Sequence, residues 1–561
     1  MIIASIARGH NASTTLLKDG EVVFYLEEER LSKKKYDGSP LLGLMEVFKH
    51  VDKIDHLVVC HTHEHGPQLD WTGENLYEGF VRKLAKKDFV FQLHEFYLNH
   101  HNMHAACGFY NSGFKSAACV IVDGAGSFLQ IEGLKDVCFE FETIFHATYP
   151  GNFKQVYKHI GTQEAMGFYH DEGSNIYITE HPGITKAYEA VTQYCGFPAI
   201  EAGKLMGLAP YGKPNSSLPP FVVDGYVNRN IIRPNYPNGA FLIPNKHAAL
   251  KDDHKYHEQG KFTDIQKDLA YKIQQESEEY VIELIRKAHE LTGEKNIVIC
   301  GGYGLNCVAN YKYQKAFPEL NIYCEPISHD GGTSIGGAKL VWNKLNNITE
   351  PSKQSSVYYG PQYDTTKYEA TLGRSGMKTT KVSAADVAKL ISEENIVCLY
   401  QGRSEGGPRA LGNRSILFDP RVKNGKDIVN EVKHREWFRP FAGSILEEYV
   451  HDWFDLAGRD SSPHMMYAVE CKPGVENKIP SVIHVDGTCR IQTVNKEQNL
   501  HYYNLISEFN KITGTPILFN TSFNLGGDPL VETLDDAIRT LQESELKYLY
   551  LPEIDTLVSK E

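Results

Sequence analysis

The stretch Asn296-Ile297-Val298-Ile299-Cys300-Gly301-Gly302 decides the fold class. Its apolar run has the length of a buried strand, and the glycine pair ends the run in a tight turn. The preceding residues 264–292 place apolar side chains at helical spacing, and Gly293 follows as a stop signal. A helix that leads into a buried strand with a Gly-rich end is typical of α/β folds. We therefore predict α/β architecture.

Two other segments support this prediction. Residues 116–122 form an apolar run that ends in Asp123-Gly124-Ala125-Gly126. Near the N-terminus, residues 14–17 and 22–26 flank Asp19-Gly20, a dipeptide that favours a β-hairpin turn. The first part of the chain thus combines a hairpin with buried strands. No internal repeat is evident in the sequence.

A change of composition divides the chain. Residues 346–366 are rich in Asn, Pro, Ser, Gln and Gly, which is typical of a linker between domains. We predict one domain over residues 1–345 and a second over residues 367–561. The second domain is expected to be α/β as well, opening with a helix at 384–393 and a strand at 396–400.

Composition limits the class of protein. The chain has 561 residues, a net charge of −13 and 11 cysteines, none in a Cys-x-x-Cys motif. The negative charge argues against stable binding of duplex nucleic acid, and unpatterned cysteines indicate reduced thiols. Met1–Ala7 lacks the cationic start of a signal peptide, and no apolar run reaches the ~18 residues of a membrane span. We expect a cytoplasmic protein without a membrane partner.

The first candidate site is a histidine pair. His100 and His104 stand four residues apart, so on a helix they share one face and can bind one metal ion. Asp123 and Asp330, at predicted strand ends, are candidate carboxylate ligands. This donor set favours Fe(II), Mn(II) or Zn(II) over Mg(II), which prefers oxygen ligands. His101 stands where a hydrolytic zincin has its Glu, so that chemistry lacks its base. The competing interpretation is a pair of structural histidines.

Three Gly-rich loops follow predicted strands, at residues 123–126, 301–304 and 330–332. Glycine lets main-chain N–H groups approach a phosphate closely. Any one of these loops is explained by an ordinary turn, but two of the three carry an Asp beside the glycines. We therefore predict a phosphate-binding role. None of the loops matches a Walker A or dinucleotide-binding motif.

Arginines crowd a short part of the second domain. Residues 402–415 are too Gly-rich for a regular element, and residues 433–441 and 519–524 add further donors. Arg is suited to bidentate phosphate contacts. We predict a polyanion pocket here, and phosphates of a nucleic acid are the competing occupant. The arginines of the crowded region are Arg403, Arg409, Arg414, Arg421, Arg435 and Arg439.

Taken together, the motifs resemble those of the NodU/TobZ-type O-carbamoyltransferases over essentially the whole chain. The residues that carry the resemblance are 9–13, 28–35, His100 with His104, 123–126, 203–212, 301–310, 402–421, 435–441 and 519–524. This chain departs from the pattern at Asn11, where Asp is expected in many relatives. An amide at that position does not supply a carboxylate for proton transfer.

The resemblance implies two modules. The N-terminal module is similar to the ASKHA-fold (actin/Hsp70-like, duplicated) subunit of the tRNA threonylcarbamoyl transferases, and the C-terminal module is similar to YrdC. By that likeness, the YrdC-like module forms carbamoyl-adenylate from ATP and carbamoyl phosphate, with Mg accompanying ATP. The ASKHA-like module, with a divalent metal for which Fe(II) is favoured, passes the carbamoyl group to an acceptor hydroxyl.

Within this resemblance each candidate residue has an expected role. His10 accepts the proton of the acceptor hydroxyl, and Lys35 neutralises the developing oxyanion. The metal ligands are His100, His104, Asp123 and Asp330. The residues expected to hold ATP and carbamoyl phosphate are Gly124, Gly126, Gly301, Gly302, Asn306, Arg409, Arg414, Lys433, Arg439, Asn520 and Ser522.

Several alternatives stay open. The acceptor is a small molecule or nucleotide with a free hydroxyl, a modified base included, and the sequence does not say which. An ASKHA-type ATPase or kinase would share the glycine loops without carbamoyl chemistry. A nucleic-acid-binding module and a tRNA-modifying activity are two further alternatives, and the oligomeric state is open.

A mixed anhydride such as carbamoyl-adenylate hydrolyses in bulk water. We therefore expect the two modules to enclose one cavity that retains the intermediate. The elements expected to face it are the 402–414 and 203–212 segments, both interpreted as irregular because of their glycines.

Overall fold

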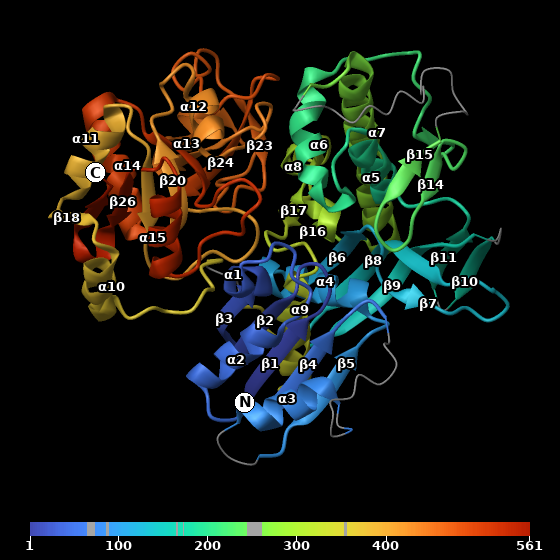
Figure 1. The fold of residues 1–561 in the computed structure, drawn as a ribbon. Helices are drawn as coiled ribbons and strands as arrows, with labels where there is room; N and C mark the ends of the chain where they lie inside the picture. The colour runs from blue at the N-terminus through green and yellow to red at the C-terminus, as the bar shows by residue number, and fades with distance from the viewer. Residues whose placement is uncertain are drawn as a thin grey trace. The chain divides into compact units, whose positions relative to one another are not determined.

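The computed structural model describes the chain except for residues 64–72, 74, 86–88, 164–166, 172, 244–260, 353–355 and 561. The described chain forms two compact units. The first unit contains Met1–Glu28 and Tyr36–Gln354, and the second contains Glu29–Lys35 and Ser355–Glu561. A short N-terminal segment therefore belongs to the same unit as the C-terminal part of the chain. Figure 1 follows the chain from blue to red through both units.

The first sheet of the N-terminal unit has the strand order β3-β2-β1-β4-β5. Its strands are β1 (Ile2–Ala7), β2 (Ser13–Lys18), β3 (Glu21–Glu27), β4 (His56–Cys60) and β5 (Gln92–Phe96). β1, β2 and β3 pair antiparallel, whereas β4 and β5 continue from β1 in parallel. The predicted hairpin is confirmed, with Asp19 and Gly20 both at positive φ in the turn.

The second sheet repeats this arrangement. Its strands include β6 (Ser116–Val122), β8 (Cys138–Thr148), β9 (Asn152–Gly161), β16 (Asn296–Cys300) and β17 (Asn321–Cys324). They lie in the order β9-β8-β6-β16-β17, with the same pattern of antiparallel and parallel pairs as the first sheet. The strand order of the first sheet therefore recurs in the second, although no repeat is evident in the sequence.

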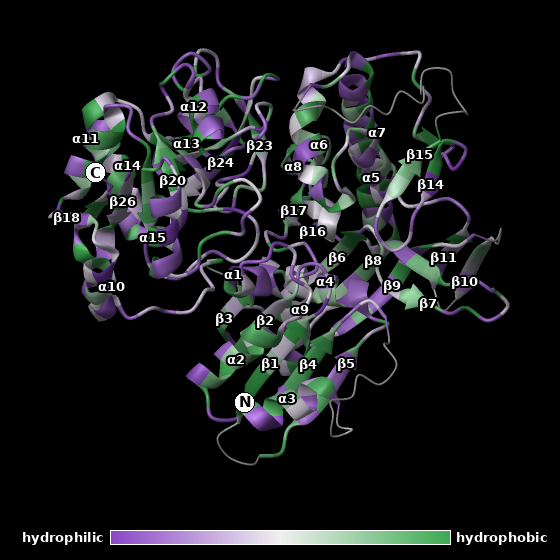
Figure 2. Cartoon of the chain, viewed as in Figure 1, coloured by the Kyte–Doolittle hydropathy of each residue, from purple (hydrophilic) through white to green (hydrophobic). Residues whose placement is uncertain are grey.

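Two helices join the sheets into one core. α4 (His100–Ser112) packs on the second sheet, α9 (Gly332–Leu345) packs on the first, and the two helices pack on each other. Gly336 allows this close approach, because a Cβ there would lie 2.0 Å from the carbonyl oxygen of Met103. Apolar residues of α4, among them Met103 and Phe109, belong to the core between the two sheets and fix the position of this helix. Figure 2 shows the strongly hydrophobic strands β1 and β4 of the first sheet in green.

The long helix α7 (Asp264–Thr292) is confirmed with the predicted bounds. Thr263 and Gln266 form a capping box at its start, and Gly293 takes a left-handed conformation at its end. The prediction that residues 203–212 are irregular is wrong, since α6 (Ala202–Leu208) and a short 3-10 turn cover them. The glycines permit close packing instead, because a Cβ on Gly212 would lie 2.0 Å from the carbonyl oxygen of Lys267 on α7.

The remaining elements of the N-terminal unit lie around these two sheets. They are α2 (Leu41–His50), α3 (Leu76–Leu84), β7 (Phe128–Leu129), β10 (Phe168–Asp171), β11 (Ser174–Thr179), α5 (Ile184–Tyr194), β12 (Val222–Val223), β13 (Tyr226–Val227), β14 (Ile232–Pro234), β15 (Ala240–Leu242) and α8 (Cys307–Ala316). Helix α1 (Glu28–Ser32) lies where the chain passes from the first unit to the second.

The second unit is built on a ten-stranded sheet of order β18-β27-β26-β19-β20-β25-β21-β24-β23-β22. The predicted helix and strand are confirmed as α11 (Ala384–Ser392) and β19 (Val397–Tyr400). They do not open the unit, however, because α10 (Tyr368–Ser375) and β18 (Lys378–Lys381) precede them. Strand β18 carries four exposed residues, so its burial pattern offers no periodic signal.

The other elements of the second unit complete this sheet and cover it. They are β20 (Arg414–Phe418), α12 (Gly425–Val432), β21 (Ala442–Leu446), α13 (Val450–Trp453), β22 (Phe454–Asp455), β23 (Ala468–Cys471), β24 (Thr488–Val494), α14 (Leu500–Thr513), β25 (Ile517–Ser522), α15 (Leu534–Glu543), β26 (Tyr548–Leu551) and β27 (Thr556–Ser559). Residues 402–413 form a loop, as predicted, but residues 414–415 of the stretch predicted to be irregular belong to β20, which begins at Arg414. All eleven cysteines are free, which confirms the expectation of thiols. Within the described residues, no helix has the length and apolarity to cross a membrane.

Candidate metal centre and anion site

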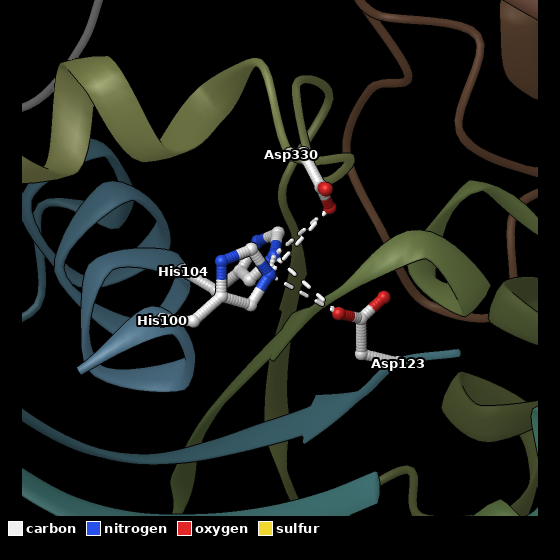
Figure 3. Close-up of side chains that lie close together, drawn as sticks. All are labelled: His100, His104, Asp123 and Asp330. Carbon is white, nitrogen blue, oxygen red and sulfur yellow. Dashed lines mark hydrogen bonds and ion pairs between the residues drawn. The ribbon is translucent and has the colours of Figure 1, made fainter. Parts of the chain in front are cut away.

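The histidine pair lies at the start of α4 on a buried helix face. His100 is the first residue of α4 and His104 follows one turn later, which places both imidazoles on the same side. Asp123 follows the last residue of β6, and Asp330 lies just before α9. One ligand atom from each of the four residues lies within 4.8 Å of all the others. Figure 3 shows the two imidazoles turned toward the two carboxylates.

The distances within this cluster fit a single metal ion. The Nε2 atom of His100 lies 3.0 Å from Nε2 of His104 and 3.2 Å from Oδ2 of Asp123. Oδ1 of Asp330 lies 3.6 Å from both imidazole Nε2 atoms. Four ligands at ~2.1 Å from a tetrahedral metal would lie about 3.4 Å from one another. The observed separations bracket that value, so the residues can hold a divalent cation with little movement.

Electrostatics in the cluster favour a cation. Burial lowers the pKa of His100, but Asp330 and Asp123 outweigh burial and raise it to about 10. Burial raises the pKa of Asp123, but the hydrogen bond from His100 and the charges of His104 and His100 together outweigh burial, so this pKa lies well below its usual range. Asp330 is shifted in the same direction, because His10 and His100 outweigh its burial. Two buried carboxylates thus stay ionised and require positive charge beside them.

A buried network behind α4 supports the histidines. The main-chain N–H of His100 donates to Oγ of Ser127, at 3.1 Å. The carboxylate of Glu140 accepts the N–H of Ser127 at 2.7 Å and pairs with the ammonium of Lys158 at 2.5 Å. Nδ1 of His101 lies 2.8 Å from Oγ1 of Thr143, and its Nε2 lies 3.9 Å from Oδ2 of Asp123. The sequence analysis missed this network, since Glu140 lies on a strand of mixed character without a motif.

His10 lies at the edge of the same centre. Its Nε2 lies 3.6 Å from Oδ2 of Asp330, and its Nδ1 lies 2.8 Å from Oδ1 of Asn11. An amide oxygen only accepts hydrogen bonds, so Asn11 favours a proton on Nδ1 and leaves Nε2 as the basic atom. The His10 side chain is 38% exposed, which leaves it open to a substrate. The residue that departs from the family pattern therefore orients its neighbour.

Two of the three Gly-rich loops, at residues 123–126 and 301–304, meet at Asp123. Gly301 has φ +86°, and a Cβ there would lie 2.3 Å from the carbonyl oxygen of Val122. The next N–H, that of Gly302, donates to Oδ1 of Asp123 at 3.2 Å. Gly124 and Gly126 follow Asp123 directly, and a Cβ on Gly124 would lie 2.7 Å from a carboxylate oxygen of Glu189. Only small residues fit in these loops beside the centre.

Asn306, which was predicted to bind a co-substrate, also has a structural role. Its side chain caps α8 by accepting the N–H of Ala309 at 3.1 Å. Its amide also exchanges hydrogen bonds with Gln274 of α7, at 3.1 and 3.2 Å. The residue is buried, so these bonds hold the loop that follows Gly301 and Gly302 against α7.

Basic side chains cluster in the second unit. Burial, together with the charges of Arg435, Arg439 and Lys35, lowers the pKa of the Lys433 ammonium well below its usual range. Burial and the charges of Arg439, Arg490 and Arg409 likewise lower the pKa of the Arg435 guanidinium well below its usual range. The main opposing charge is Glu436, which lies 3.5 Å from Arg439. Lys35 belongs to this basic cluster of the second unit by its position in the fold.

Lys433 also holds the end of β25. Its Nζ donates to the main-chain oxygen of Ser522, to the main-chain oxygen of Asn524 at 2.8 Å and to Oδ1 of Asn524 at 3.0 Å. The hydroxyl of Ser522 donates to the same Oδ1, at 2.6 Å. Asn520 is fully buried and donates to Oγ of Ser444 at 2.9 Å and to the main-chain oxygen of Ala410 at 3.2 Å. These residues therefore connect β25 with the Gly-rich loop.

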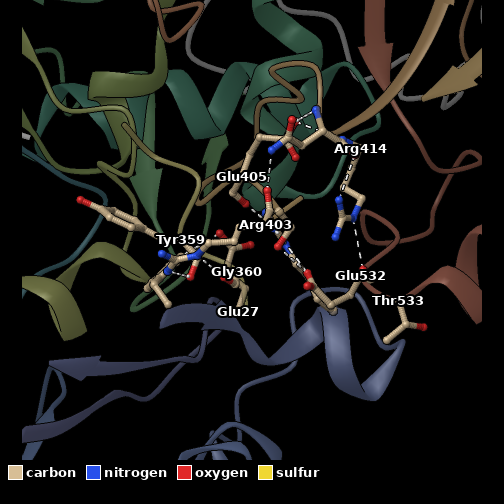
Figure 4. Close-up of polar contacts among 12 residues, drawn as sticks. Glu27, Tyr359, Gly360, Arg403, Glu405, Arg414, Glu532 and Thr533 are labelled. Carbon is tan, nitrogen blue, oxygen red and sulfur yellow. Dashed lines mark hydrogen bonds and ion pairs between the residues drawn. The ribbon is translucent and has the colours of Figure 1, made fainter. Parts of the chain in front are cut away.

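The guanidinium of Arg414 donates its hydrogen bonds to main-chain oxygens. This group is fully buried, lies 3.9 Å over the Tyr400 ring and donates to four carbonyl oxygens, those of Gln401, Gly402, Asn413 and Glu532. Arg403 likewise donates to the carbonyl oxygens of Tyr359 and Gly360. Figure 4 shows both guanidinium groups directed at the polypeptide. Of the predicted phosphate ligands, Arg409 and Arg439 are the arginines with part of their surface exposed in the basic cluster.

Comparison with known proteins identifies the family. Residues 70–339 match the family described as Carbamoyltransferase N-terminus, and residues 388–560 match the Carbamoyltransferase C-terminus family. Nodulation protein NolNO of Sinorhizobium fredii is 30% identical over 96% of this chain and 77% of its own length. The chain belongs to the carbamoyltransferase family. It is therefore a carbamoyltransferase enzyme, as the motifs predicted.

Other relatives of this carbamoyltransferase align over similar lengths. An uncharacterized protein of Synechocystis sp. is 31% identical over 98% of this chain and 95% of its own. Nodulation protein NolO of Bradyrhizobium diazoefficiens is 32% identical over 80% of this chain and 77% of its own. Among solved structures, full-length HypF in a phosphate- and nucleotide-bound form aligns over 63% of this chain and 56% of its own, with 13% identity and a TM-score of 0.36.

Proposed function

We propose that this enzyme uses ATP and carbamoyl phosphate to place a carbamoyl group on the hydroxyl of a small molecule or nucleotide. The observation that carries the proposal is the presence of two chemically different sites in one chain. The first unit has a buried centre of two imidazoles and two carboxylates, suited to a divalent cation. The second has a cluster of basic side chains suited to phosphates.

The second unit is proposed to form carbamoyl-adenylate. Combining carbamoyl phosphate with ATP to give carbamoyl-adenylate, pyrophosphate and phosphate consumes one water. Both co-substrates, carbamoyl phosphate and ATP, carry several negative charges, so their approach requires cations. Arg409, Arg435, Arg439 and Lys35 supply these, and an anion bound among them would relieve the mutual repulsion that lowers the pKa of Lys433 and Arg435. This role matches a YrdC-like module, which we propose for the second unit.

The first unit is proposed to transfer the carbamoyl group. A divalent cation bound by the four ligands, with Fe(II) favoured and Mn(II) or Zn(II) as alternatives, would act there as a Lewis acid. Nε2 of His10, oriented by Asn11, would accept the proton of the acceptor hydroxyl. The N–H of Gly302 donates to Oδ1 of Asp123, so the Gly301–Gly302 turn helps to hold this ligand at the centre. The repeated sheet topology supports an ASKHA-type assignment for this unit.

Product analysis tests the proposal. The enzyme is incubated with ATP, carbamoyl phosphate and a panel of sugars, antibiotics, nucleotides and hydroxymethylated bases, and products are identified by mass spectrometry. We expect an acceptor that gains one carbamoyl group only when both co-substrates are present, with release of pyrophosphate. ATP consumption that does not depend on carbamoyl phosphate would contradict the proposal and favour an ASKHA-type ATPase or kinase.

A further inference from the structure

A segment from the N-terminal part of the chain lies inside the second unit. Glu29–Lys35 is grouped with residues 355–561, although the flanking residues belong to the first unit. The central residue of this contact is Arg30, which is 2% exposed. Its Nη2 donates to the carbonyl oxygen of Gly407 at 2.8 Å, and its Nη1 donates to the carbonyl oxygen of Glu405. Both acceptors belong to the Gly-rich loop of residues 402–413.

The loop is held from the other direction by a buried carboxylate. Oε1 of Glu405 accepts the main-chain N–H groups of Leu411, Asn413 and Arg414, at 2.7, 2.8 and 3.1 Å. Glu405 therefore fixes the donors on the C-terminal side of the loop, and Arg30 fixes the carbonyls on its N-terminal side. Arg409 lies between these two held parts, two residues after Gly407 and two before Leu411.

The charges in this buried network balance only when Arg30 is present. Glu405 and Glu532 are both fully buried, and Arg414 is the other buried cation beside them. Nη1 of Arg30 lies 3.9 Å from Oε2 of Glu532. The same Oε2 accepts the hydroxyl of Ser404 at 2.7 Å, which ties Glu532 to the start of the loop. Loss of Arg30 would leave two buried carboxylates with one guanidinium.

A second pair fixes the segment itself. Nζ of Lys33 lies 2.5 Å from Oδ2 of Asp536, a carboxylate that also caps α15 by accepting the N–H of Thr533 at 2.9 Å. Arg30 is thus held in place by a helix that does not depend on the loop. Lys33 therefore fixes the segment to α15, and a different residue, Arg30, contacts the loop.

We propose that Arg30 is a positioning residue for the anion site of the second unit. By holding the carbonyl oxygens of Glu405 and Gly407, it keeps the loop in the conformation that presents Arg409 to the phosphates. The site that forms the adenylate then requires residues from both ends of the chain. This inference rests on the proposed function of the second unit.

The test compares Arg30→Ala and Arg30→Lys with Lys34→Ala in the full-length protein. Lys34 is an exposed neighbour on the same segment and serves as the control. Pyrophosphate exchange into ATP is measured against carbamoyl phosphate concentration, and hydrogen exchange is measured at the amides of Leu411, Asn413 and Arg414. We expect Arg30→Ala to lower kcat/KM for carbamoyl phosphate on the order of 10²-fold. The three amides should exchange faster, and added guanidinium should restore part of the activity.

Arg30→Lys keeps the positive charge, but a single ammonium group replaces the two guanidinium donors. We therefore expect an intermediate loss of kcat/KM that added guanidinium does not restore. If Arg30→Ala does not fold, kcat/KM and amide exchange of Arg30→Lys test the proposal in its place. A lower melting temperature with unchanged kcat/KM and unchanged amide exchange would overturn the proposal, because Arg30 would then stabilise without positioning. Absence of carbamoyl phosphate-dependent exchange in the wild-type enzyme would instead contradict the proposed function, while the amide exchange would still report on Arg30.

Discussion

The Nε2 atoms of His100 and His104 lie 3.0 Å apart, with Oδ2 of Asp123 3.2 Å from the first and 3.9 Å from the second. Two imidazole nitrogens this close share either a proton or a cation. The two buried carboxylates beside them make a divalent cation the better occupant, because it balances both negative charges.

Replacement of one ligand tests the metal centre. We expect His104→Ala to lose the bound metal and to lower carbamoyl transfer on the order of 10²-fold or more, since a Lewis acid contributes several kcal/mol. Formation of carbamoyl-adenylate should persist. Metal content is measured by elemental analysis, with His146→Ala as a control, because His146 pairs with Glu294 away from the centre. Full metal content in His104→Ala would refute the assignment.

The anion site should respond independently. We expect Arg409→Ala or Arg439→Ala to abolish the ATP–pyrophosphate exchange that carbamoyl phosphate supports, because each lost charge-assisted bond costs roughly 1.5–3 kcal/mol. Bound metal should stay unchanged. Arg374→Ala is the matched control, since Arg374 is exposed on α10, where it donates to Oγ1 of Thr371 at 3.0 Å and lies 3.8 Å from Asp535. Wild-type exchange rates in both variants would place activation elsewhere.

Glu140 predicts a pH-dependent contribution to stability. Burial raises its pKa, but Lys158 and His101 outweigh burial and lower it to about 2, from 4.5. Because the folded pKa is depressed, the stabilisation is complete above pH 4.5 and is lost as the pH falls toward 2. Glu140→Gln should therefore cost about 3 kcal/mol at pH 7. Urea unfolding at several pH values should show this difference narrowing below pH 4.5, and a constant difference would contradict the assignment.

The packing of α4 on α9 can be tested with glycine. Gly336→Ala would place a Cβ 2.0 Å from the carbonyl oxygen of Met103, so α4 must shift. We expect a loss of about 1–3 kcal/mol and weaker metal binding, because α4 carries both histidines. Gly373→Ala on α10 meets no atom within 4 Å and should stabilise by about 0.5–1 kcal/mol. Equal effects of the two changes, measured by thermal unfolding, would show that the close approach is unimportant.

The sequence by itself determined the local elements and the ligand types. The bounds of α7, the strand before Gly301 and the N-terminal hairpin follow from apolar periodicity and turn residues, which record burial along a few neighbouring residues. The spacing of His100 and His104 required one helix face. Asp123 was found because it stands beside glycines where an apolar run ends. Asp330 was found because it stands beside glycines, although it lies just before α9 and not, as predicted, at the end of a strand.

Only the tertiary structure decided which distant segments meet. The repeated sheet order, Glu140 behind α4 and Arg30 on the Gly-rich loop all join residues far apart in the chain, and no local pattern records such pairings. The tertiary structure also distinguishes two arginines of the same motif. Arg414 is buried and donates to main-chain oxygens, whereas Arg409 belongs to the basic cluster. The physical reason is that residue type sets what a group can bind, whereas burial and long-range packing decide what lies within its reach.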